Sequence, residues 1–424
     1  MIIKLLKNIG IGLLYLLSGA LVPVLFAGGL YLSGGFMAGY PVFGLMLLLT
    51  GSWFWFLSRR AGTLGGAALR GLPAALGFGI VIWAMVPLPQ HDFSEMKPDE
   101  RFEQWDLGNG RIVSVARFHP PEGVDARGET IVFVHGGPGA YLRDFDIDFL
   151  SGFTADGFSV LVYDQVGAGR SSVMEVSGYT HQANVDDLRQ ILGRLGSPAI
   201  LFGQSYGAGV VTSYLGRYGN EPDIRQIIIT EPGPLPGADF SSSDGKTTLA
   251  ENAKGITPAD LIRSPRMVLV FLLPFNNQFV QQQEFRGFFS PEMQRAAVAS
   301  SYCAQHADQL LPFEHFPINL PAMMLIRDTF LEEKTPDLTE LGIPVLLLLG
   351  ECSYIPRQYA LAYFDYYRFS RSHLIREVGH VLWTTPDGIR LTRESILSFL
   401  NGSDSILPNK PTRETRSAFF EAGL

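Results

Sequence analysis

Three long apolar runs fill the first part of the chain: residues 9–32, 36–57 and 72–88. Between Lys7 and Arg59 no residue is charged, and Ser33–Gly35 separates the first two runs. Each of these two is long enough to cross a hydrocarbon core about 30 Å thick as a helix of about 20 residues. The third run has 17 residues and lies at the short end of the spanning range. We therefore predict an all-α transmembrane region of about three helices within residues 1–91.

The few basic residues of this region predict its orientation. Lys4 and Lys7 precede the first run, and Arg59, Arg60 and Arg70 lie between the second and the third. Positive residues favour the cytoplasmic side, so three crossings place the rest of the chain outside the cell (inner) membrane, in a periplasmic or extracytoplasmic position. If the third run only lies in the interface, the rest is instead cytoplasmic. A cleaved signal peptide explains the first run but not the next two.

From about residue 102 the pattern changes to short β-rich runs separated by amphipathic segments. We expect strands at 130–135, 159–164, 199–203, 224–230, 344–350 and 373–377, and helices at 185–195, 206–217, 357–367 and 387–400. This alternation is typical of a largely parallel α/β sheet with helices on both faces.

Charge and composition exclude several function classes. Residues 1–91 hold five of the 33 basic residues and no acidic one, so residues 92–424 hold 28 basic and 41 acidic residues, a net charge of −13. Such a domain repels phosphate backbones, and we predict no nucleic-acid partner. The eight histidines show no H-x-x-x-H or H-x-H spacing, so we predict no metal and no cofactor. Cys303 and Cys352 form either one disulfide or two free thiols.

A candidate nucleophile lies where a predicted strand turns into a predicted helix. The run Gly203-Gln204-Ser205-Tyr206-Gly207 has the G-x-S-x-G pattern, in which small residues flank a serine on a sharp turn and expose its Oγ. The N–H of Tyr206 lies at the start of the helix, beside the point of attack. It is a natural donor for an oxyanion.

Two further segments follow strands at the same edge of the sheet. In His135-Gly136-Gly137-Pro138-Gly139, the glycines let backbone N–H groups approach an oxyanion, and we assign the second donor to Gly137. His380 follows the last predicted strand and can serve Ser205 as a general base and then as an acid. His135 is the competing base, but it adjoins the glycines and is better placed to order their loop.

These segments resemble the proline iminopeptidase family of α/β hydrolases. The match comprises residues 135–139, 163–171 and 203–207, in that family's order and approximate spacing. The resemblance covers about residues 100–400. It implies an α/β-hydrolase core at 92–233 and 339–424 and a helical cap at 234–338, inserted after the sixth strand. Asp164 and Arg170 look like structural members of their loop.

The third member of the catalytic triad is left open by the sequence. The family usually has an aspartate where this chain has Ser353, and a serine cannot balance an imidazolium by charge. Glu231, at the end of the predicted strand 224–230, and Glu351, just after the predicted strand 344–350, both keep the order Ser, acid, His. Some haloalkane dehalogenases of this fold place their acid after the sixth strand. Glu231 is therefore favoured, with Glu351 as the alternative.

The predicted activity is hydrolysis through an acyl-enzyme. The resemblance implies a prolyl aminopeptidase-like enzyme acting on short peptides or amides, although no clear copy of that family's tryptophan–glutamate cap segment is present. Glu284, Glu292 and Glu314 are the cap carboxylates available. The alternatives are an esterase or lipase acting on hydrophobic esters and a non-catalytic binding or sensor protein. No substrate-binding residue is assigned.

Overall fold

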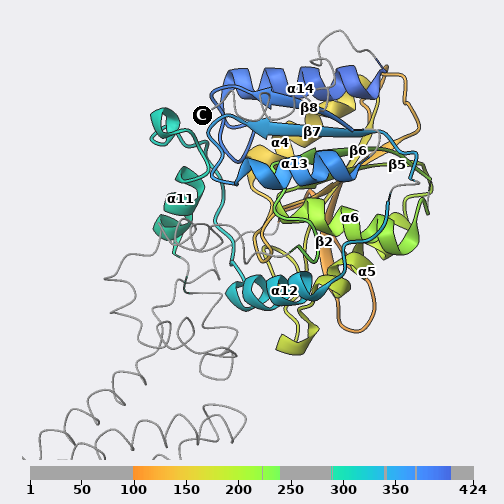
Figure 1. The fold of residues 1–424 in the computed structure, drawn as a ribbon, viewed down its shortest axis with the longest axis vertical. Coiled ribbons are helices and arrows are strands. Elements are labelled where there is room, and N and C mark those ends of the chain that lie inside the picture. Colours follow the sequence, from red (N-terminus) through yellow and green to blue (C-terminus); the bar gives the residue numbers. More distant parts are fainter. Residues whose placement is uncertain are drawn as a thin grey trace, which may run out of the picture. The chain divides into compact units, whose positions relative to one another are not determined.

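Eight strands form one mixed sheet in the computed structural model, which describes residues 99–221, 223–238, 288, 290–338, 341–367 and 370–402 (Figure 1). The strands are β1 Phe102–Asp106, β2 Ile112–Phe118, β3 Thr130–Val134, β4 Ser159–Asp164, β5 Ala199–Gln204, β6 Ile224–Thr230, β7 Val345–Gly350 and β8 Ser370–Ile375. Their order across the sheet is β1-β2-β4-β3-β5-β6-β7-β8. β1 pairs with β2, and β2 with β4, in antiparallel fashion, and all the other pairs are parallel.

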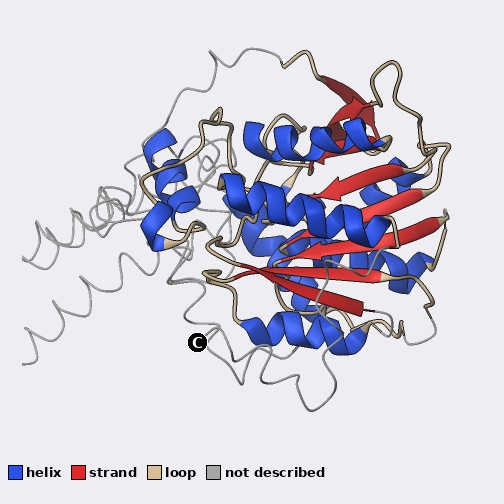
Figure 2. Ribbon diagram, turned by 90° about the horizontal axis from the view of Figure 1, so that it is seen from above, coloured by secondary structure: helices blue, strands red, loops and turns tan. Residues whose placement is uncertain are grey.

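Helices cover both faces of this sheet (Figure 2). They are α4 Asp144–Ser151, α5 His181–Leu192, α6 Tyr206–Tyr218, α13 Arg357–Tyr366 and α14 Pro386–Leu400. Successive strand side chains point to opposite faces, so alternate residues enter different cores. Leu201 packs in the core with α5, α6 and α13, whereas Phe202 packs in the core with α4 and α14. Burial on both faces explains why β3, β5 and β7 are apolar throughout.

The prediction of a largely parallel α/β sheet is confirmed, with differences at the edges. The predicted strand at 373–377 was placed too late, because β8 pairs with β7 from Val345↔Ser370 to Gly350↔Ile375. Register with a neighbouring strand, which the local pattern does not contain, fixes that boundary. No helix was predicted at α4, where the N–H of the N-cap residue Arg143 donates to Oδ2 of Asp146 at 3.0 Å.

The predicted cap, 234–338, is described only in part. It contains α11 Pro291–Ala299, the short 3₁₀ helix η5 Ala304–His306, and α12 Leu320–Glu332. The described residues from 290 onward belong to the same compact unit as the sheet. The limits of the cap stay a prediction.

The three predicted transmembrane runs lie outside the described residues. Within the ranges that the structure describes, no helix has both the length and the apolar character needed to cross a membrane.

Candidate active site

Ser205 occupies the sharp turn between β5 and α6. Its backbone has φ 55° and ψ −119°, a conformation that costs a residue with a Cβ about 1–3 kcal/mol. The turn is crowded, since a Cβ on Gly203 would lie 2.8 Å from the Cα of Ala208 and one on Gly207 would lie 1.9 Å from the oxygen of Val134. Packing therefore requires the two flanking glycines of the motif. The strained turn leaves Ser205 half-buried.

The glycine loop after β3 lies against this turn. A Cβ on Gly136 would lie 2.8 Å from the Cβ of Ser205, and the N–H of Gly136 donates to Gln204 Oε1 at 3.0 Å. In the described part of the chain, no oxygen accepts a hydrogen bond from the backbone N–H of Gly137 or of Tyr206. Tyr206 is the first residue of α6, so its N–H also lies at the positive end of the helix dipole. Among the described residues, both predicted oxyanion donors thus have an N–H without an acceptor.

His380 lies in the loop after β8 and is buried, with 6 % of its surface exposed. Its Nδ1 is 3.7 Å from Oε2 of Glu231 and has no hydrogen-bond partner among the described residues. The side chain of Gln204 reaches toward the backbone oxygen of His380 at 3.5 Å. Gln204 thereby bridges the glycine loop and the histidine loop directly beside Ser205.

Glu231 directly follows β6 and is 2 % exposed. Its backbone has φ 47°, a strained value for a residue other than glycine, and its N–H donates to the oxygen of Leu348 in β7 at 3.1 Å. The carboxylate accepts a hydrogen bond from the N–H of Gly350. Strain and neighbouring strands together direct this buried carboxylate toward His380.

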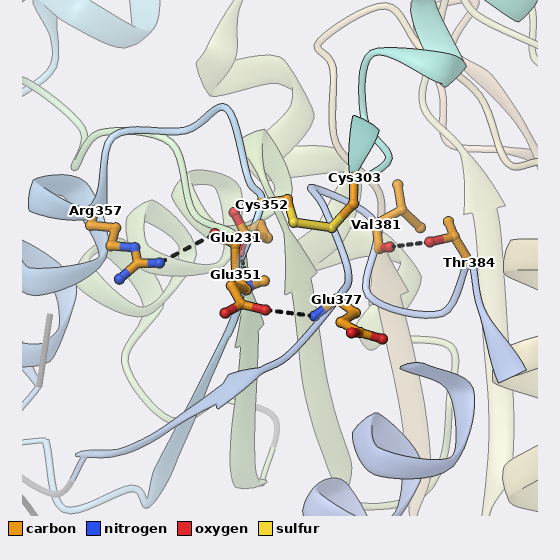
Figure 3. Close-up of a disulfide and its surroundings, with 9 residues drawn as sticks. Glu231, Cys303, Glu351, Cys352, Arg357, Glu377, Val381 and Thr384 are labelled. Atoms are coloured by element: carbon orange, nitrogen blue, oxygen red, sulfur yellow. Dashed lines mark hydrogen bonds between the residues drawn. A yellow bond between two sulfur atoms is a disulfide. The ribbon is translucent and has the colours of Figure 1, made fainter. Parts of the chain in front are cut away.

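The alternative acid points elsewhere. Glu351 is exposed, and its carboxylate accepts a hydrogen bond of 2.9 Å from the N–H of Glu377 (Figure 3). Ser353, at the place of the expected aspartate, accepts from the N–H of Ile355 at 3.2 Å. Of the two carboxylates left open by the sequence, Glu231 is the one that faces the histidine.

Residues 131–390 match the sequence pattern of the Alpha/beta hydrolase family, which is more than half of the chain. The protein belongs to the alpha/beta hydrolase family.

Curated relatives of this chain are named for different activities. A bifunctional esterase/perhydrolase of Acinetobacter calcoaceticus is 32% identical over 120 residues, which are 28% of this chain and 43% of that protein. A proline iminopeptidase of Saccharolobus solfataricus is 30% identical over 128 residues, 29% of this chain and 39% of that one. A putative non-heme chloroperoxidase of Synechocystis is 34% identical over 152 residues, 35% of this chain and 53% of that one. The chain thus matches about half or less of each relative's length.

His135, the competing candidate for the general base, has a structural role in this alpha/beta hydrolase. His135 Nε2 accepts from the N–H of Gln165 at 2.9 Å, so the ring proton resides on Nδ1, which donates to the oxygen of Gly136 at 2.7 Å. Complete burial lowers the pKa of His135, because the charged form loses its hydration. A neutral imidazole with both nitrogens engaged orders the glycine loop, as the sequence predicts.

A buried polar network that the sequence does not reveal lies beneath the oxyanion donors. The hydroxyl of Tyr206 lies 2.8 Å from Nδ1 of His181 and accepts from Nδ2 of Asn184 at 3.2 Å. Asn184 also donates to Gln165, which in turn donates to the backbone oxygen of His135 at 2.7 Å. The network therefore links the residue after Ser205 to the glycine loop. Only the tertiary structure brings α5, α6 and the β4 loop together there.

Asp164 and Arg170 hold the loop after β4. Asp164 accepts from the N–H of Leu142 at 2.7 Å and from Nη1 of Arg170 at 3.1 Å. The guanidinium of Arg170 lies over the ring of Phe316, 3.8 Å from its centroid. Both side chains are structural, as expected. Across the ranges that the structure describes, no three His, Cys, Asp or Glu side chains group in a way that suits a metal ion.

The two cysteines form a disulfide (Figure 3). Cys303 follows α11, and Cys352 lies in the loop after β7, next to Glu351. The sequence left open either one disulfide or two free thiols, and the structure contains the disulfide. It joins the segment after α11 to a loop that borders the candidate site.

Proposed function

We propose that this alpha/beta hydrolase is a serine hydrolase that works through an acyl-enzyme. The observation that carries the proposal is the strained turn that presents Ser205, together with a buried Glu231 that faces Nδ1 of His380 at 3.7 Å. Nucleophile, acid and base (Ser205, Glu231 and His380) follow one another in the chain order of this fold. Each comes from the carboxyl end of a strand, where α/β proteins place their chemistry.

The mechanism has two half-reactions. The imidazole of His380 takes the proton of Ser205 Oγ as the oxygen attacks the substrate carbonyl, and then delivers it to the leaving group. The N–H groups of Gly137 and Tyr206 hold the oxyanion of each tetrahedral intermediate. Glu231 stabilises the imidazolium while it exists. Water, activated by the same histidine, then releases the acyl group.

The leading proposed substrate is a short peptide or amide with an N-terminal proline or another small residue. This choice is supported by the three segments similar to proline iminopeptidases, at 135–139, 163–171 and 203–207, and by relatives of that name. An aminopeptidase also needs a carboxylate for the free amine, a role proposed for the cap residues Glu284, Glu292 and Glu314. Glu284 lies outside the described residues.

The second candidate is an esterase that acts on hydrophobic esters. Glu292 and Glu314 are both exposed, whereas a carboxylate that binds the substrate amine is expected to be enclosed by the cap. The esterase/perhydrolase relative supports the same candidate. The third alternative, a non-catalytic protein, was motivated by Ser353 in place of the usual aspartate. Glu231 beside His380 supplies an acid, and this weakens the argument for a non-catalytic protein.

A substrate panel is expected to separate peptidase from esterase. We expect prolyl and other small aminoacyl naphthylamides to be turned over, together with nitrophenyl esters, because an acyl-enzyme forms from either. The measurement is kcat/KM for each substrate, with the Ser205→Ala variant as background. Turnover of esters alone would replace the peptidase proposal with the esterase one.

We further propose that the hydrolase domain is anchored in the inner membrane on its extracytoplasmic side. The apolar runs of residues 1–91 and their basic loops support this orientation. The Cys303–Cys352 disulfide supports it independently, because such bonds persist mainly in oxidising compartments.

Orientation can be measured with a reporter joined after residue 95. Alkaline phosphatase fused there is expected to be active, since that enzyme requires export to form its own disulfides. A fusion after residue 64, between the second and third runs, serves as the control and is expected to be inactive. An inactive fusion at 95 beside an active one at 64 would invert the proposed orientation.

A further inference from the structure

The segment that follows α11 touches the backbone of the catalytic loop. The N–H of His380 donates to the oxygen of Ser301 at 2.8 Å. The preceding residue, Gly379, packs so closely that an added Cβ would lie 2.2 Å from that same oxygen. The position of Ser301 therefore fixes where the backbone of His380 lies.

The disulfide joins this segment to a second one that contacts the same loop. Cys303, two residues after Ser301, is bonded to Cys352, whose N–H donates to the oxygen of Val378 at 3.0 Å. The histidine loop thus contacts two backbone segments that one covalent bond holds together. We call residues 301–303, Cys352 and their bridge the clamp. Farther along the loop, Trp383 is held separately by a 2.8 Å hydrogen bond from its Nε1 to Asp146.

The helix before the clamp also contacts the oxyanion side of the site. The hydroxyl of Tyr141, just after the glycine loop, donates to Oε1 of Gln294 in α11 at 2.6 Å. Burial raises the pKa of Tyr141 to about 12, so the phenol keeps the proton that this bond needs. Gln294 in turn donates to the oxygen of Phe316 at 2.9 Å. One helix and the turn after it therefore contact both loops that flank Ser205.

The contact between His380 and Glu231, which the clamp supports, tolerates little displacement of the ring. Nδ1 of His380 lies 3.7 Å from Glu231 without a direct hydrogen bond, and the ring packs against Tyr354 with centroids 4.6 Å apart. A shift of about 1 Å in a catalytic group can cost on the order of 10²-fold in rate. A displaced Ser301 carbonyl would release the His380 N–H and let the ring move away from Glu231.

We propose that the Cys303–Cys352 disulfide is a positioning element for His380 and makes hydrolysis depend on the oxidation state of the protein. The inference rests on the proposed serine-hydrolase function. A dithiol reductant would cleave the S–S bond to two thiols, giving up two electrons and two protons and becoming a cyclic disulfide. Cys303 is 2 % exposed, but residue Cys352 is exposed, so we expect the reductant to reach the bond from the side of Cys352.

The test compares three forms of the full-length protein, purified in detergent: oxidised, reduced with dithiothreitol, and the double variant Cys303→Ala/Cys352→Ala. We expect kcat to fall on the order of 10- to 100-fold in the last two forms with KM unchanged, because the reacting groups, not the substrate contacts, are displaced. Reoxidation should restore the kcat of the reduced wild type. Dithiothreitol should not affect the double variant.

Controls separate positioning from folding and from the parent proposal. Ser300→Ala, one residue before the clamp, removes an exposed hydroxyl bonded within α11 and should keep full activity and full sensitivity to reduction. An unchanged kcat in the folded, reduced enzyme refutes the positioning role, and so does loss of activity only in step with the circular dichroism signal. An oxidised enzyme that neither turns over substrate nor reacts with a fluorophosphonate refutes the serine-hydrolase function itself.

Discussion

Replacing Ser205 with alanine is expected to abolish turnover and covalent labelling by a fluorophosphonate probe. Loss of the nucleophile of a triad lowers kcat on the order of 10⁴-fold or more, and the residual rate comes from the oxyanion donors and binding. Alanine keeps the Cβ that the strained turn already accommodates at φ 55°. The variant should therefore fold like the wild type, and the loss is chemical.

The measurement is in-gel labelling of purified full-length protein beside kcat on the best substrate of the panel. Ser353→Ala is the matched control, because that hydroxyl only accepts from the N–H of Ile355 and has no described contact with His380. It should keep both labelling and turnover. A wild-type protein that stays unlabelled under conditions where a known serine hydrolase reacts would favour the non-catalytic alternative.

Replacing Glu231 with glutamine is expected to lower kcat on the order of 10³-fold or more, because an amide cannot stabilise the imidazolium of His380 by charge. Glutamine keeps the size of the side chain and an oxygen that can accept from the N–H of Gly350. The change thus removes charge while preserving the buried contact. KM should change much less than kcat, since the charge is needed mainly in the transition state.

The same substitution at Glu351 provides the comparison. Glu351→Gln retains an oxygen for the N–H of Glu377. Because Glu351 is exposed, losing its charge should change the stability of the protein little. We expect kcat to stay within about twofold of the wild type, as for most surface substitutions. Equal losses in the two variants, or a larger loss at 351, would refute the assignment of Glu231. Circular dichroism of both variants verifies that they fold.

The sharp turn that holds Ser205 was predictable because the residues that form it are local in sequence. A strand, a glycine, the serine, another glycine and a helix follow one another directly in the chain, so the residues that create the turn are neighbours in sequence. The same holds for the glycine loop after β3, whose close approach to Ser205 needs small residues wherever the two segments meet. Of the two candidate bases, His380 could be chosen over His135 because only His135 adjoins the glycine loop.

The choice of acid depended on tertiary structure. Glu231 and Glu351 both follow strands at the same edge of the sheet, and the sequence contains nothing that aims one carboxylate and not the other. The aim comes from the strained backbone of Glu231 and from hydrogen bonds with Leu348 and Gly350, which belong to a strand more than 100 residues away. Pairing between distant strands is set by the whole sheet and not by local propensity.

By itself, the sequence determined the fold class and predicted Ser205, the glycine loop and His380 as site residues, because each prediction depends on residues adjacent in the chain. Only the tertiary structure decided which glutamate faces His380, how Tyr206 is anchored, and that Cys303 meets Cys352 across 49 residues. Those contacts join segments far apart in sequence, and their geometry depends on how helices and strands pack around a shared core.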